Sequence, residues 1–127
     1  MQNMLASMKW MANLTLYHNP RCSKSREALR LLEDNNQDFS IFLYLNENLN
    51  HADISALIDR LGISARELLR KNEDDYKVNN LNNTDLGSDE LIEFMIQFPK
   101  IIEGPMLDNG IKAIIWRKTE KILKLLE

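Results

Sequence analysis

The chain has 127 residues, 44% of them hydrophobic and 28% charged, which is enough to bury one core but not two sizeable ones. Its formal charge of −3 gives the whole chain no attraction to nucleic acid or to an anionic membrane, because both require an excess of positive charge. The single cysteine excludes an intramolecular disulfide, and the absence of a cysteine framework favours a reducing, cytoplasmic setting.

The N-terminal segment is apolar enough to raise the question of a signal peptide. Its only cation, Lys9, follows the apolar stretch, and polar residues interrupt that stretch. We therefore interpret residues 1–12 as an N-terminal extension that is prone to disorder. Residues 13–127 are then expected to form a single domain.

A strand, a helix and a second strand are predicted in the first part of this domain. Apolar and polar positions alternate over residues 14–17, and a turn follows just before Cys22. Cys22 opens a helix over residues 23–34, which consist mostly of good helix formers with one apolar side. Residues 39–45 are β-rich and nearly all apolar, as in a strand covered on both faces. This order indicates a parallel crossover unit.

Helices are predicted in the middle of the chain. Apolar residues at helical spacing predict a helix that Gly62 ends. Ser64 and Glu67 have the spacing of a capping box at the start of a short helix. Residues 72–87 are rich in Asn and Asp, which favours short helical turns or loop, and another helix begins at Ser88. Together these segments form a helical insert.

The last predicted elements are a short strand, a hairpin and a helix. The strand covers residues 100–103, and Pro105 precedes the hairpin. The hairpin has its turn at residues 108–110 and its return strand over residues 112–116. A helix from Lys118 closes the chain. The order of elements predicts an α/β fold with a mixed sheet and flanking helices.

Cys22 is the candidate nucleophile. A cysteine at a helix N-terminus faces unpaired amides and the positive end of the helix dipole, which favour the thiolate. Arg21, Lys24 and Arg26 add positive charge around it, and His18 precedes it across a turn. The alternative is a small buried cysteine, which needs apolar neighbours that this segment lacks. The setting therefore favours a reactive thiol.

No second sulfur is available to release an oxidised Cys22. Ser25 occupies the position where a dithiol motif has its second cysteine. Disulfide exchange requires a second thiol, so an outside thiol must restore Cys22. We expect glutathione, or a glutaredoxin that uses it, as partner and co-substrate, with no bound cofactor.

The remaining candidate residues are basic. His18 is either a functional partner of the cysteine or a turn residue that binds backbone, whereas His51 is expected to be solvated. One cysteine and two dispersed histidines do not form a recognisable zinc ligand set. Arg70 and Arg117 are candidates for an oxyanion site, because a guanidinium presents a planar fork of donors. The alternative for each is an ordinary solvated side chain.

Three segments of the sequence resemble the ArsC family, the glutaredoxin-linked arsenate reductases of bacteria. They are residues 17–26 around the cysteine, residues 66–72 with Tyr76 after them, and residues 98–105. Trp116-Arg117 and the final helix complete the pattern. The resemblance implies a thioredoxin-like fold with a helical insert.

The resemblance also implies a reaction. Cys22 would attack arsenate, and glutathione would displace the thiol-bound arsenic as it is reduced to arsenite. By this resemblance, His18 would adjust the reactivity of the Cys22 thiol, and Ser25 would form a hydrogen bond with it. Pro105 would be a cis-proline facing the cysteine.

The same resemblance implies that Arg70 and Arg117 bind the oxyanion. The family usually has an arginine before the proline of the third segment, where this chain has Gly104. Loss of one charge-assisted contact weakens oxyanion binding by roughly 1.5–3 kcal/mol. Arg26, with its basic neighbours, is a candidate to replace that charge.

Two alternatives to arsenate reduction stay open. One is a glutathione-dependent thiol reductase that does not act on arsenate. The other is a Spx-like regulator that binds RNA polymerase, a class that shares this fold. We expect a cytoplasmic monomer that binds neither nucleic acid nor membrane.

Overall fold

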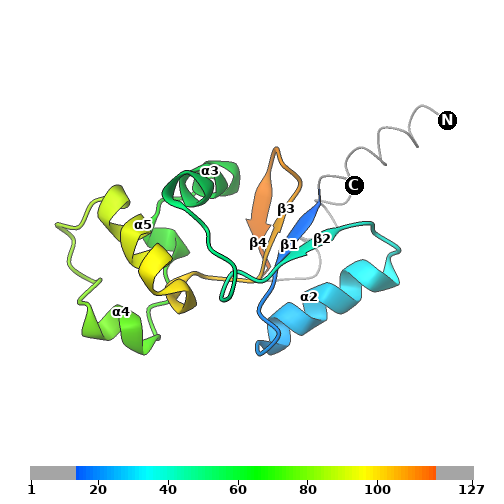
Figure 1. Cartoon of the computed structure of the whole chain (residues 1–127), viewed down its shortest axis with the longest axis horizontal. Coiled ribbons are helices and arrows are strands. Elements are labelled where there is room, and N and C mark those ends of the chain that lie inside the picture. Colours follow the sequence, from blue (N-terminus) through cyan, green and yellow to red (C-terminus); the bar gives the residue numbers. More distant parts are fainter. Residues whose placement is uncertain (1–13, 117–127) are drawn as a thin grey trace. The chain divides into compact units, whose positions relative to one another are not determined.

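The computed structural model describes residues 14–116. Figure 1 shows its helices and strands, and η denotes a 3-10 helix in the text below. In chain order they are β1 (Thr15–Tyr17), α2 (Ser23–Asp34), β2 (Ser40–Phe42), α3 (His51–Leu61), η1 (Arg66–Leu68), α4 (Asp74–Val78), α5 (Ser88–Gln97), η2 (Pro99–Ile101), β3 (Met106–Asp108) and β4 (Ala113–Ile115). The predicted extension and the predicted final helix lie outside the described residues.

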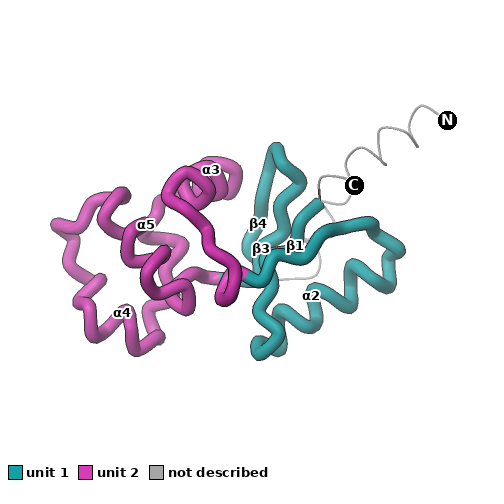
Figure 2. The backbone as a smooth tube through the Cα atoms, in the orientation of Figure 1, with its two compact units in different colours: residues 1–43, 104–127 teal, residues 44–103 magenta. Residues whose placement is uncertain are grey.

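The chain divides into two compact units, each described here by itself (Figure 2). Unit 1 comprises residues 1–43 and 104–127, and unit 2 comprises residues 44–103. Unit 2 begins just after β2 and ends just before β3, so it is inserted between two strands of unit 1. That residues 13–127 form a single domain stays a prediction.

Unit 1 contains a four-stranded mixed sheet in the order β2-β1-β3-β4. β1 pairs in parallel with β2, where Leu16 lies opposite Ile41. On its other side β1 is antiparallel to β3, and β3 is antiparallel to β4. The parallel pair joined through α2 confirms the predicted crossover unit, and the mixed sheet with flanking helices confirms the α/β fold.

Helix α2 covers one face of this sheet (Figure 1). The bounds of α2 are those predicted from the sequence. The prediction used its apolar positions, which repeat at helical spacing. Ala28 and Leu32 of α2 are fully buried against Leu16 and Leu107 of the sheet, and Trp116 completes the cluster. Full burial of one leucine side chain contributes roughly 1.5–3 kcal/mol, so this cluster holds α2 on the sheet.

Unit 2 is helical, and its helix ends follow the local sequence. Asn50 and Asp53 form a capping box that starts α3, with Asp53 N donating to Asn50 Oδ1 at 2.8 Å and Asn50 N donating to Asp53 Oδ2 at 3.1 Å. Gly62 ends α3 with φ of 67°, which confirms its predicted role. The predicted box of Ser64 and Glu67 is also confirmed, with Glu67 N donating to Ser64 Oγ at 3.2 Å.

The predicted strand at residues 100–103 is wrong. Pro99 opens the 3-10 helix η2 instead, because its fixed φ and missing N–H suit the first position of a helix. Only Ile102 forms a β-bridge, with Leu69. The strand predicted at residues 39–45 is shorter than expected, since β2 ends at Phe42 and the chain then enters unit 2.

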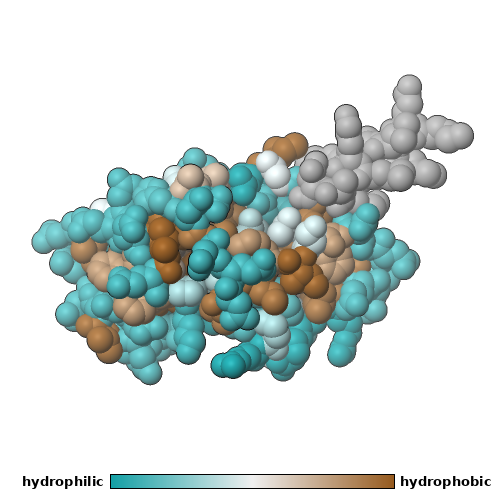
Figure 3. Space-filling view, viewed as in Figure 1, coloured by the Kyte–Doolittle hydropathy of each residue, from teal (hydrophilic) through white to brown (hydrophobic). Residues whose placement is uncertain are grey.

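The surface carries few large hydrophobic side chains. Hydrophilic residues predominate on the face drawn in Figure 3, and hydrophobic residues form small patches there. In the described part of the chain the exposed large hydrophobic residues are Ile41, Val78, Ile96 and Ile111. No helix among the described residues is long and apolar enough to cross a membrane.

Candidate active site

Cys22 lies at the start of α2, directly after the turn that leaves β1. His18 N donates to Phe42 O at 2.9 Å and so continues the pairing of β1 with β2. Cys22 N then donates to Asn19 O at 3.0 Å, which closes the turn. Cys22 is the N-terminal cap of α2 in an extended conformation, and Arg26 N donates to its carbonyl at 3.1 Å. The half-buried thiol is free, and the Cys22 side chain makes no capping hydrogen bond to the N–H groups of the first helical turn.

A buried hydrogen-bonded pair, His18 and Ser25, links the end of β1 to α2. His18 Nδ1 and Ser25 Oγ are 2.6 Å apart, and Asn19 N donates to the same Ser25 Oγ at 2.9 Å. Ser25 is fully buried and His18 is 5% exposed. Ser25 is the third residue of α2, a position from which a side chain can reach back to the cap, which here is Cys22.

His18 is held in its neutral form. Burial lowers the pKa of His18 from its usual value of about 6.5, and the nearby positive charge of Arg26 lowers this pKa further. A neutral imidazole acts on its surroundings through hydrogen bonds rather than through a positive charge. The tautomer decides whether His18 Nδ1 donates to Ser25 Oγ or accepts from it.

The turn before Cys22 is fixed by contacts of its own. Arg26 Nη1 donates to Pro20 O at 2.9 Å, and Arg21 N donates to Asn19 Oδ1 at 3.0 Å. Asn19 therefore contributes its amide N–H, its carbonyl and its side chain to the geometry around the cysteine. The sequence places Asn19 in the turn before Cys22, as expected for an asparagine before a proline, but does not mark it as a candidate site residue.

Pro105 lies at the same end of the sheet as the cysteine turn. The peptide bond before Pro105 is cis. The register pairs Tyr17 with Met106, so the next residues outward, His18 and Pro105, are neighbours across β1 and β3. On the other side Trp116 N donates to Pro105 O at 2.9 Å.

Of the two predicted oxyanion residues, only Arg70 is among the described residues. Arg70 belongs to unit 2, whereas the cysteine belongs to unit 1. Arg70 Nε is 3.4 Å from Glu103 Oε1, and its Nη1 is 3.8 Å from Glu73 Oε1. Sequence reasoning did not anticipate either carboxylate. Arg117 lies outside the described residues.

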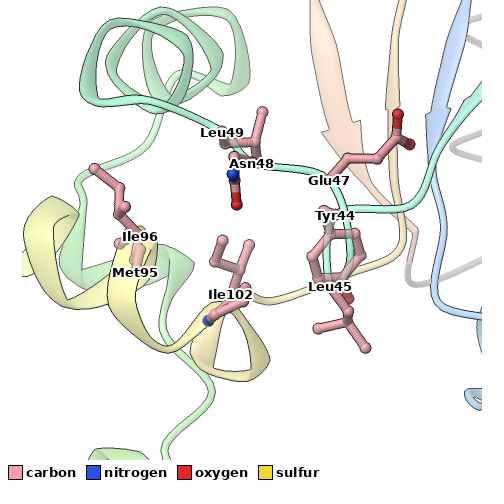
Figure 4. A pocket seen from close by; sticks show the side chains of 9 residues that line it. Tyr44, Leu45, Glu47, Asn48, Leu49, Met95, Ile96 and Ile102 are labelled. Atoms are coloured by element: carbon pink, nitrogen blue, oxygen red, sulfur yellow. The ribbon is translucent and has the colours of Figure 1, made fainter.

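A metal site and a ligand pocket are two other kinds of functional site that a chain can provide. Among residues 14–116 no group of three or more His, Cys, Asp or Glu side chains could hold a metal ion. Figure 4 shows a pocket of about 250 Å³ within unit 2, between residues that include Tyr44, Leu49, Met95 and Ile102. Glu47 is the charged residue among its described lining.

His51 has a partner that the sequence did not indicate. Its Nε2 lies 3.1 Å from Asp89 Oδ1, which links the start of α3 to the start of α5. Both side chains are exposed, at 40% and 89%. Such an exposed pair contributes little to stability.

A mixed β2-β1-β3-β4 sheet, with a cysteine at the start of the helix that follows β1, defines the thioredoxin-like fold class. Within that class the chain belongs to the ArsC family, whose sequence model matches residues 17–125.

Known proteins cover nearly the same length as this chain. It is 43% identical over 111 residues to the uncharacterized protein YfgD of Escherichia coli strain K12, covering 87% of this chain and 93% of that protein. It is 38% identical over 115 residues to an arsenate reductase of Haemophilus influenzae, covering 90% and 99%. A solved arsenate reductase from Vibrio cholerae has a TM-score of 0.85 and 34% identity, covering 88% of this chain and 96% of that one.

Proposed function

We propose that this protein is an oxidoreductase that reduces arsenate to arsenite, with Cys22 as nucleophile and glutathione or a glutaredoxin as electron donor. The observation that carries the proposal is the place of the chain's single cysteine, at the N-terminal cap of α2 beside the His18–Ser25 pair. The similarity to arsenate reductases supports the choice of substrate.

The first step forms a bond between Cys22 Sγ and arsenic. The backbone N–H groups at the start of α2 favour an anion at this position, which is where the thiolate lies. Sγ attacks the arsenic, and one arsenate oxygen takes up protons and leaves as water. Arsenic remains in its +5 state in this thiol-bound intermediate.

The second step transfers two electrons. The sulfur of glutathione attacks Cys22 Sγ, an S–S bond forms, and the S–As bond breaks with its electron pair on arsenic. Arsenic is thereby reduced from +5 to +3 and leaves as arsenite. A second glutathione, or a glutaredoxin, then attacks the mixed disulfide and restores the Cys22 thiol. In total, arsenate and two thiols give arsenite, one disulfide and water.

The neighbouring residues have proposed roles in the first step. If neutral His18 donates from Nδ1 to Ser25 Oγ, that oxygen accepts from both His18 and Asn19 N, and its own O–H is available to Cys22 Sγ. Arg26 would add positive charge near the oxyanion, and Pro105 would line the site.

The oxyanion itself would be bound by Arg70 and Arg117, whose guanidinium groups suit a tetrahedral anion. An outside thiol is required, because no other cysteine in the chain can release Cys22. A reducing cytoplasm that supplies glutathione is the proposed setting, and a monomer is the proposed working form.

Arsenite formation by the purified full chain tests the proposal. We expect arsenite only when thiol is added, and none from Cys22→Ser, because serine lacks the sulfur that bonds to arsenic. His51→Gln is the control variant, since His51 pairs with Asp89 in unit 2 and should retain activity. Arsenite formation by Cys22→Ser, or none from the wild-type protein at any thiol concentration, would contradict the proposal.

A second candidate is reduction of glutathione mixed disulfides. Gly104 favours it, because the position before Pro105 carries no charged side chain that could bind an oxyanion. The same Cys22 thiolate would attack the disulfide sulfur of a glutathionylated peptide. Turnover of such a peptide by a protein that produces no arsenite would establish this second function instead.

A further inference from the structure

Arg70 lies between two carboxylates, Glu103 and Glu73. We propose that these two glutamates are specificity-determining residues that weaken oxyanion binding at Arg70. The inference rests on the proposed function, in which Arg70 binds the oxyanion substrate. The inference adds that Glu103 and Glu73 lower the affinity of this site for anions.

The two carboxylates contact different nitrogens of one guanidinium. Glu103 Oε1 is 3.4 Å from Nε, and Glu73 Oε1 is 3.8 Å from Nη1. The side chains of Arg70, Glu73 and Glu103 are 27%, 34% and 28% exposed, so water screens the group only in part. Within this set of three side chains, two carboxylates face one guanidinium.

The backbone holds Arg70 and Glu103 beside each other. Arg70 N donates to Ile101 O at 2.8 Å, and Glu103 N donates to Leu68 O at 2.7 Å. Between these two bonds lies the bridge of Leu69 with Ile102, and both of those side chains are buried. Two antiparallel segments therefore fix the pair in register, independently of the contact between the charged groups.

Glu73 is fixed by a different element. It is the N-terminal cap of α4, and Tyr76 N donates to its carbonyl at 3.1 Å. Glu73 follows Arg70 by three residues across a turn, in which Glu73 N donates to Arg70 O at 3.4 Å. The two carboxylates near Arg70 thus come from two segments of the chain, and different backbone contacts hold each segment.

Coulomb repulsion decides the direction of the effect. Because the backbone already positions Arg70, a partly exposed ion pair adds little to its placement. Repulsion between each carboxylate and a bound oxyanion rises in proportion to the negative charge of that anion. The adjacent Gly104 offers no charge to offset it. Removing one carboxylate should therefore strengthen anion binding rather than weaken it.

Glu103→Gln and Glu73→Gln test the inference, since each replaces a carboxylate by an amide of the same shape. We expect each to lower the KM for arsenate by roughly 3- to 10-fold with little change in kcat, and the effect to shrink at high salt. Asp89→Asn is the matched control, because it removes an exposed carboxylate of unit 2 that pairs with His51 instead. An unchanged or higher KM in Glu103→Gln and Glu73→Gln would overturn the inference.

Direct binding separates this inference from the proposed function. The dissociation constant of arsenate is measured by calorimetry with the full wild-type chain and both glutamine variants. Tighter binding by the variants supports the inference even if the wild-type protein forms no arsenite, which would contradict the proposed function alone. Equal or weaker binding by both folded variants overturns the inference even if arsenite is formed.

Discussion

At the residue scale, the candidate site contains a buried histidine whose pKa is lowered. His18 is buried at the end of β1, where its ring bonds to Ser25 and the charge of Arg26 opposes protonation. Protonating His18 in the folded protein is therefore costly, whereas the unfolded chain protonates this residue at its ordinary pKa of about 6.5. The protonation state of His18 therefore affects both the candidate site and the free energy of unfolding.

The linkage predicts a loss of stability in mild acid. Because the pKa of His18 is lower in the folded state, the unfolded state binds more protons below about pH 6.5, so the free energy of unfolding falls as the pH decreases through this range. His18→Asn should reduce this fall, since asparagine can still bond Ser25 but does not titrate. Urea unfolding between about pH 7.5 and pH 5 measures the effect. Equal pH dependence of the two proteins would contradict it.

Residues close in sequence are easier to group from the sequence alone than residues far apart. His18, Cys22 and Ser25 lie within one turn and the helix that it opens, so a local pattern already grouped them. Arg70 and Glu103 are 33 residues apart and meet only through the pairing of their two segments. No local pattern contains such a pair, and the charge that surrounds Arg70 could not be predicted from the sequence.

At the element scale, helix ends were predictable because their signals are local. The start of α2 after Cys22 and the capping box of Ser64 and Glu67 each rest on a few consecutive residues. The segment after Pro99 was misread as a strand because apolar β-branched residues suit either a strand or a buried 3-10 turn. Its actual conformation depends on its pairing with distant residues 68–70, which the local sequence does not specify.

The end of α3 predicts a graded cost of substitution. Gly62 has φ of 67°, and a Cβ added there would have no other atom within 4 Å, so the cost of Gly62→Ala comes from the backbone alone. We expect Gly62→Ala to reduce the free energy of unfolding by about 1–2 kcal/mol, and Gly62→Asn to reduce it less. Urea unfolding provides the measurement.

Gly87→Ala is the matched control for Gly62. Gly87 caps α5 with φ of −84°, and an added Cβ would meet only Glu90 Oε1 at 3.8 Å, an ordinary contact. Because alanine is a poorer N-cap than glycine, Gly87→Ala should still reduce the free energy of unfolding by about 0.5 kcal/mol, which is less than the loss expected for Gly62→Ala. A loss at Gly87 equal to that at Gly62 would show that left-handed backbone geometry is not the cause.

At the scale of the whole molecule, one chain passes from unit 1 into unit 2 and back. All four strands of the sheet come from unit 1, and α3, α4 and α5 come from unit 2. The proposed nucleophile belongs to the first unit and one proposed anion-binding residue to the second. Arsenate reduction would then require both units, so the cooperativity of their folding bears directly on function.

The buried indole of Trp116 can serve as a fluorescence probe for the folding of unit 1. Trp116 is 8% exposed in the core beneath α2, and the chain's other tryptophan, Trp10, can be replaced by phenylalanine. Emission from Trp10→Phe would then report unit 1, while circular dichroism includes the helices of unit 2. We expect the two signals to change together during urea unfolding, as a single cooperative domain requires. Loss of helical signal at a urea concentration that leaves the emission unchanged would show that the two units unfold separately.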